Sequence, residues 1–187
     1  PMEVRAPPPF EWLPQDNGSS ADAVVVFSEV MYHAANGNTN LQWIELQNVM
    51  RVDVDLSNWR IDAGANYTFP PGTVIPGGGF VVVAKAIPTF TLATGVITAF
   101  GPFTNNLANS GEHLVLRNHD NRLMDEMTYG DEQPWPEGAD GSGATLSKRT
   151  PLSASAEPTH WIASPQLGGT PGRANFPAAT TPAETTP

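Results

Sequence analysis

The chain has 187 residues, 40% hydrophobic and 15% charged, with 19 prolines, 17 glycines and no cysteine. Its net charge of −10 argues against binding to nucleic acid or to an anionic membrane surface, because such binding depends on Lys and Arg. The lack of cysteine excludes disulfides and Cys-based zinc sites. No apolar run approaches the roughly 20 residues of a transmembrane helix, so we expect no membrane insertion.

Both ends of the chain have the composition of linkers. Residues 1–21 mix Pro, Gly, Ser and Asp around a short apolar patch at Phe10, Trp12 and Leu13, and residues 177–187 contain only Pro, Ala, Thr and Glu. Such segments favour extended, solvated conformations. We therefore expect one domain over residues 22–176 between two linkers, in a chain that belongs to a longer polypeptide.

The central part of the sequence carries a regular series of strand patterns separated by turn residues. Alternation in residues 41–49 puts Ile44 and Leu46 on one face and Trp43 and Glu45 on the other. Residues 80–84 are hydrophobic enough for a central strand. The expected strands are residues 23–32, 41–49, 56–62, 67–70, 73–75, 80–84, 112–117, 122–129, 144–148 and 160–163, with a looser, β-rich stretch at 94–100.

The turns agree with these strands. An Asn/Asp-rich turn at residues 118–121 predicts a hairpin between its two neighbouring strands. No window of 11 or more residues shows a 3.6-residue period. Many short strands at nearly regular spacing predict an all-β fold, a β-sandwich.

The order of several motifs resembles that of bacterial lamin-tail domains. The opening motif is Trp43-Ile-Glu-Leu-Gln-Asn48, followed by Asp55-Leu-Ser-Asn-Trp-Arg-Ile61. The resemblance continues through residues 67–84, 107–116 and 125–129. It closes with Trp135-Pro136 and with a Gly-Gly-Thr-Pro-Gly-x-x-Asn motif at residues 168–175.

The resemblance covers about residues 24–175 and implies an immunoglobulin-like β-sandwich without catalytic residues. In bacteria such modules are parts of secreted or cell-surface multidomain proteins. In animals the module is the globular tail of nuclear intermediate filaments. That filament role is not carried over, because this sequence has no coiled-coil heptads.

No catalytic motif stands out. The sequence has no Gly-x-Ser-x-Gly elbow and no phosphate-binding loop, and its four histidines lack metal-ligand spacing. Cofactors are therefore not expected, apart from calcium, which takes six to eight oxygen ligands from acidic loops. The candidate calcium ligands are Asp53, Asp55, Asp131 and Asp140; the alternative is that they are ordinary solvated acids.

Three residues are candidates for ligand recognition. Trp43 and Glu45 share a strand face, where an indole could stack on a sugar and a carboxylate could bond its hydroxyls; the alternative is that Glu45 pairs with an arginine across the sheet. Trp135 lies between two prolines, which stiffen its loop. It is either an exposed recognition residue or a plug that closes one end of the sandwich.

These features predict a non-enzymatic structural or interaction module of a secreted or cell-surface multidomain protein. Its partner would be another protein or other domains of the same polypeptide. The alternative is a carbohydrate-binding module, with or without the assistance of calcium, that binds a polysaccharide for a secreted enzyme. A shared fold does not establish either function.

Overall fold

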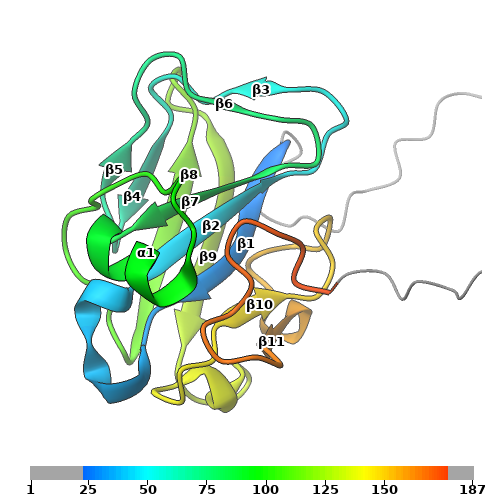
Figure 1. Cartoon of the computed structure of the whole chain (residues 1–187). Coiled ribbons are helices and arrows are strands. Elements are labelled where there is room, and N and C mark those ends of the chain that lie inside the picture. The colour runs from blue at the N-terminus through cyan, green and yellow to red at the C-terminus, as the bar shows by residue number, and fades with distance from the viewer. Residues whose placement is uncertain (1–22, 177–187) are drawn as a thin grey trace, which may run out of the picture.

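The computed structural model describes residues 23–176, which form two packed antiparallel sheets (Figure 1). The larger sheet has the strand order β11-β10-β1-β2-β7, the smaller has the order β5-β4-β8-β9, and β3 pairs with β6. The strands are β1 (Val25–Met31), β2 (Trp43–Asn48), β3 (Val54–Asp55), β4 (Arg60–Ala63), β5 (Tyr67–Thr68), β6 (Val74–Ile75), β7 (Phe80–Ala84), β8 (Gly111–Arg117), β9 (Leu123–Gly130), β10 (Leu146–Lys148) and β11 (Trp161–Ala163).

The helices are short. They are α1 (Ile87–Thr94) and the 3-10 turns η1 (Ala35–Gly37), η2 (Thr39–Leu41), η3 (Glu137–Ala139) and η4 (Pro158–His160). None of the helices in residues 23–176 is long and apolar enough to cross a membrane. The expected linkers, residues 1–21 and 177–187, lie outside the described residues.

The main core lies between the two sheets, and strand alternation builds it. Ile44 and Leu46 of β2 face this core, as the alternation predicts, against side chains such as Ile61 and Leu116 of the other sheet. A second, smaller core lies on the outer face of the large sheet, where Trp43 packs with α1. The expected immunoglobulin-like β-sandwich is confirmed.

The predicted β character of residues 94–100 is wrong. The preceding residues form α1, which Pro88 is able to join because the first helical turn needs no backbone donor. Gly95 ends the helix in the left-handed conformation at a φ of 76°, and its N–H donates to Thr91 O at 2.8 Å. At eight residues, α1 is too short to show a helical period over a window of 11 residues.

Two other strand predictions need correction. β7 lies at the edge of the large sheet and is not central. It is nonetheless buried because α1 covers its outer face, and because Phe100 bridges its free edge by donating to Val82 O and accepting from Ala84 N. The strand expected at residues 56–62 begins only at Arg60, since Leu56 and Trp59 belong to a turn closed by the bond from Trp59 N to Leu56 O.

A buried polar network joins the two sheets where β1 and β9 meet. Asp125 of β9 accepts hydrogen bonds from Phe27 N at 2.8 Å and from the Ser155 hydroxyl at 2.6 Å. Ser155 in turn accepts from Lys148 Nζ at 2.8 Å. The register of β1 against β2 shifts between Phe27 and Glu29, and the carboxylate supplies an acceptor beside this irregularity.

Asp125→Ala is expected to lower the free energy of unfolding by about 3–5 kcal/mol, because it leaves the Lys148 ammonium buried without its counter-charge. Urea unfolding followed by fluorescence measures this. The exposed turn residue Asp120, changed to Ala, is the control and should cost less than about 0.5 kcal/mol. Equal losses in both variants would contradict the role assigned to Asp125.

Candidate functional site: the outer face of the large sheet

The outer face of the large sheet carries two neighbouring rows of side chains. In one row, β10, β1 and β2 place Ser147, Glu29 and Glu45 in direct cross-strand register. Two residues further along the strands, Met31 and Trp43 face each other in an apolar row. The polar row and the apolar row are covered by different parts of the chain.

The polar row is covered by residues 167–175, which we call the C-terminal strap. Thr170 donates to Glu29 Oε2 from its backbone N at 2.9 Å and from its hydroxyl at 3.0 Å. The hydroxyls of Ser147, at 2.7 Å, and Thr145 donate to Glu29 Oε1. Glu29 therefore receives four hydrogen bonds, two of them from the strap, although its side chain is fully buried.

Further contacts fasten the other end of the strap. Asn175 Nδ2 donates to the backbone oxygens of Ser28 at 2.9 Å and Lys148 at 3.2 Å. Its Oδ1 lies 2.9 Å from the Thr170 hydroxyl oxygen, whose single proton is shared between Asn175 Oδ1 and Glu29 Oε2. Because Ser28 and Lys148 lie in β1 and β10, the strap closes over the seam between these two strands.

Glu45 is as buried as Glu29 but has fewer donors. Its Oε2 accepts one bond from Gly172 N of the strap at 2.6 Å, and its Oε1 has no hydrogen-bond partner among the described residues. Burial, together with the neighbouring Glu29, raises the pKa of Glu45 to about 8. Burial also raises the pKa of Glu29, but the hydrogen bonds from Thr145, Ser147 and Thr170 oppose that rise, so the proton of the pair is favoured on Glu45 at neutral pH.

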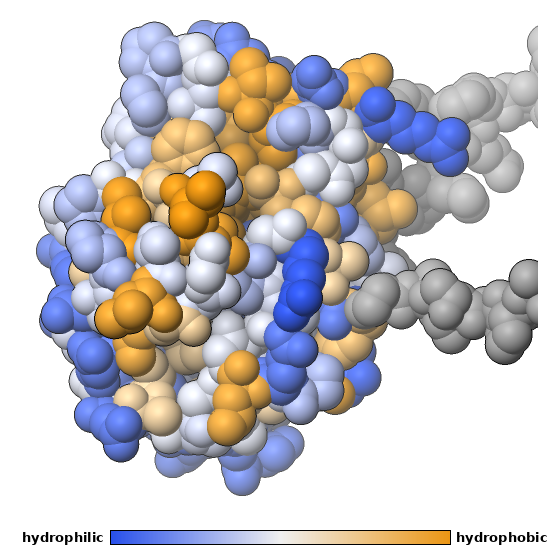
Figure 2. Space-filling model, viewed as in Figure 1, coloured by the Kyte–Doolittle hydropathy of each residue, from blue (hydrophilic) through white to orange (hydrophobic). Residues whose placement is uncertain are grey.

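A groove runs between α1 and the strap. Its first hollow, of about 270 Å³, has Met31, Trp43 and Phe90 among its lining residues. A second hollow of about 280 Å³ continues it, and Ala93, Thr94, Leu167 and Gly168 line both. Figure 2 shows apolar side chains gathered on this face over α1 and beside it.

Exposed apolar side chains belong to the elements that border the groove. Leu92 and Ile97 belong to α1 and the segment after it, and Leu167 belongs to the strap; their exposed fractions are 89%, 81% and 77%. The groove thus presents an apolar surface, and the packed rings of Trp43 and Phe90 form its floor. Such a patch is typical of a surface that contacts another molecule.

Two of the three predicted recognition residues belong to this face, though neither is exposed. Trp43, 2% exposed, lies at the floor of the groove, and Glu45 lies under the strap. Glu45 does not pair with an arginine, because Arg60 and Arg117 both bond Asp62 instead. The face therefore offers no exposed indole and carboxylate side by side for a sugar.

The third predicted recognition residue, Trp135, lies far from the groove. Its side chain is 7% exposed and belongs to the main core, with its ring 6.3 Å from that of Trp161. The structure therefore agrees with the second interpretation of this Pro-bounded loop, in which the indole packs against the end of the sandwich and closes it.

The four predicted calcium ligands are not brought together. Asp53 accepts from Gly77 N at 3.0 Å and Asp55 from Ser57 N at 2.8 Å, so both stabilise the turns near β3. Asp140 pairs with His33. Asp131 lies near Tyr32, where burial and the charges of Asp140 and Asp131 raise the pKa of the hydroxyl. Within residues 23–176 no three His, Cys, Asp or Glu side chains are grouped as a metal site would require.

Sequence reasoning missed what covers this face. The motif at residues 168–175 was recognised but given no contact, and Pro88 followed by Gly95 was not interpreted as the start and end of a helix. Helix-boundary residues could have located α1. Nothing in the local pattern could have paired Thr170 with Glu29, since 141 positions separate them.

The two sheets, their shared core and their strand order define an immunoglobulin-like β-sandwich module. The family model of the Lamin Tail Domain matches residues 18–131, more than half of the chain. The chain belongs to this family. The match ends before β10, β11 and the strap, and no curated protein matches the chain.

Glu45 makes stability depend on pH. The pKa of Glu45 is about 8 in the folded chain and about 4.3 in an unfolded one, so its stabilising contribution is complete below about pH 4.3 and is lost as the pH rises through 8. We expect the free energy of unfolding to fall by up to about 1.4 kcal/mol per pH unit between pH 5 and 8, and Glu45→Gln to flatten this slope. Urea unfolding at pH 5, 6.5 and 8 measures it.

The control for this experiment is Glu137→Gln, which changes an exposed carboxylate of η3 and should keep the wild-type slope. An unchanged slope in Glu45→Gln would contradict the assignment of the proton to Glu45.

Alanine substitutions at two neighbouring glycines test whether the strap packs against Glu29. Gly168 and Gly169 have φ of 82° and 70°, so alanine at either costs about 1–2 kcal/mol of left-handed strain. A Cβ at Gly168 meets nothing, whereas one at Gly169 would lie 2.8 Å from Thr145 Cγ2 and 2.9 Å from Glu29 Cδ. We expect Gly169→Ala to lower the free energy of unfolding by about 1–3 kcal/mol more than Gly168→Ala.

Urea unfolding compares the two variants, and amide exchange at Thr170 and Gly172 shows whether the loss is at the strap. Equal losses, or exchange unchanged in Gly169→Ala, would mean that the strap does not rest on Glu29 as described.

Proposed function

We propose that this chain is a non-catalytic interaction module of a secreted or cell-surface multidomain protein. It binds a protein partner, or another domain of its own polypeptide, in the groove between α1 and the strap. The observation that carries this proposal is the two-part hollow with Leu167 exposed in its wall, bordered by α1 and the segment after it, on which Leu92 and Ile97 are exposed. Protein-binding surfaces have such a concave apolar centre.

The position of the reactive groups supports a non-catalytic role. The carboxyls of Glu29 and Glu45 are closed off by the strap, and the Lys148–Ser155–Asp125 network lies inside the sandwich. A catalytic group has to reach hydrogen-bonding distance of a substrate. Among residues 23–176, no carboxylate, histidine or lysine lines the groove.

The composition of the C-terminal residues supports the proposal that this module belongs to a surface protein and positions other domains. Residues 177–187 have the Thr/Pro-rich composition of tethers that separate domains. This composition supports a module tethered to other domains of a surface protein.

Selection from a displayed library of random heptapeptides tests binding in the groove. We expect the wild-type chain to enrich peptides, and Ala93→Trp to weaken their binding at least tenfold, because Ala93 lines both hollows and an indole there would fill them. Val74→Trp, at a half-exposed site on β6, is the matched control and should bind as the wild type does.

Fluorescence polarisation with the enriched peptides gives the dissociation constants. If no peptide is enriched, or if Ala93→Trp binds them as tightly as the wild type, the groove is not a protein-binding site. Binding of polysaccharides that Ala93→Trp abolishes would instead favour the carbohydrate-binding alternative.

A further inference from the structure

The two hollows of the groove differ in chemistry. The first is lined almost entirely by apolar groups, including Met31, Leu41, Trp43 and Phe90. The second also has polar groups in its lining, from Gln166, which precedes the strap, and from Arg173 of the strap. A ligand that fills both hollows therefore meets an apolar surface first and a guanidinium second.

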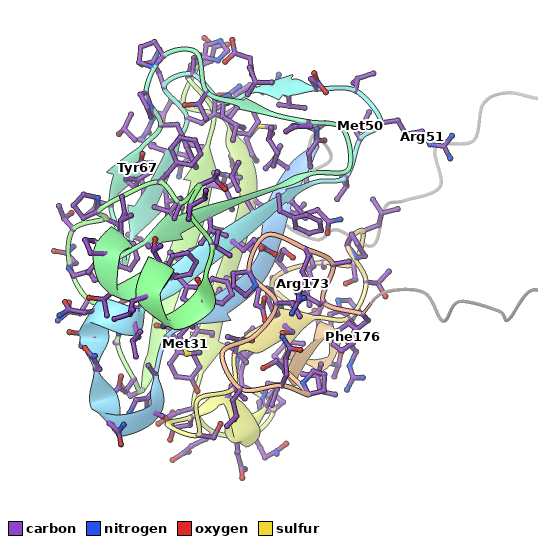
Figure 3. All side chains as sticks on the ribbon, viewed as in Figure 1. Met31, Met50, Arg51, Tyr67, Arg173 and Phe176 are labelled. Carbon is purple, nitrogen blue, oxygen red and sulfur yellow. The ribbon has the colours of Figure 1, made fainter. Side chains whose placement is uncertain are left out.

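Of the described residues that line the two hollows, Arg173 is the one that carries a charge. Its side chain is exposed and forms no ion pair with a carboxylate of the described residues. In Figure 3 it projects from the strap on the same face as α1. A free guanidinium at the end of an apolar groove is unusual in a chain with a net charge of −10, and it fits a carboxylate, which it can bind through two parallel bonds.

The hollows are adjacent because they share two wall residues from α1 and two from the strap. Each has room for one large side chain. Residues i and i+2 of an extended segment point to the same side and lie about 6.6 Å apart. Such a segment can therefore place one side chain in each hollow.

We propose that the partner is a polypeptide segment with a large apolar residue at position i, which fills the first hollow, and Asp or Glu two positions away, at i+2 or i−2 according to the direction of the segment, which binds Arg173 in the second. This inference rests on the proposed function and names the chemistry of its partner. Arg173 sets the specificity for the acidic residue, and the apolar hollow contributes the larger share of the affinity.

The same heptapeptide library distinguishes this inference from the proposed function. Selection on the wild-type chain should enrich Asp or Glu two positions before or after a large apolar residue. Selection on Arg173→Glu should enrich Lys or Arg there, and the acidic peptides should bind that variant at least fivefold more weakly. A structural effect of the substitution would weaken binding without reversing the preferred charge.

Arg51→Glu is the matched control, since it makes the same charge change on an exposed arginine that lines neither hollow and lies far from Arg173 (Figure 3). It should keep the preference for acidic peptides. Peptides that need the groove but show no acidic preference, or the same preference in Arg173→Glu, would overturn the inference and leave the proposed function standing. Failure of Ala93→Trp to affect binding would overturn both.

One competing occupant belongs to this chain itself. Phe10-Glu11-Trp12-Leu13, outside the described residues, has the same combination of apolar and acidic side chains. If Trp12→Ser bound the selected peptides tenfold more tightly than the wild type, or if the wild type formed a dimer that Ala93→Trp abolished, the occupant would come from this chain, which would overturn the inference. We expect unchanged affinity and a monomer in sedimentation.

Discussion

The outer face of the large sheet depends on the burial of Glu29. A carboxylate without access to water must have its oxygens bonded, and here four donors from Thr145, from Ser147 of β10 and from the strap do so. Two of these donors belong to Thr170, so the strap has to lie across the sheet in one position. Since the strap is also one wall of the groove, the shape of the groove follows from the hydrogen bonding of a single buried group.

The partition of that face explains why a groove exists at all. The polar row of Glu29 and Glu45 is best covered by backbone donors, whereas the apolar row of Met31 and Trp43 is best covered by the side chains of α1. Two different covers meet along the boundary between the rows, and neither fills it. The groove is the gap between them. The proton on Glu45 lies directly beneath one of its walls, so that the electrostatics of the pair and the position of the strap are coupled.

How far the sequence predicts this structure differs from element to element. The strands β1, β2 and β7 and the hairpin of β8 and β9 follow from alternation and turn residues, because these are properties of a few consecutive residues. Helix α1 was missed because its eight residues are too few for a helical period to appear, so that this stretch was given no defined element. The predicted recognition residues Trp43 and Glu45 were assigned to the correct face, but as exposed groups, because nothing in their own strand shows that the strap and α1 cover them.

By itself, the sequence determined the all-β class, most strand positions, the inner and outer faces of β2 and the membership of the Lamin Tail Domain family. The sequence also showed the motif at residues 168–175, but not which residues this motif contacts. Only the tertiary structure decided that this motif closes over Glu29, that Glu45 holds a proton, that Trp135 plugs the sandwich and that Arg173 stands at the end of an apolar groove. The physical reason is distance along the chain. Alternation and turns act between neighbouring residues, whereas burial and hydrogen bonding between Glu29 and Thr170 arise only after the sheets have brought them together.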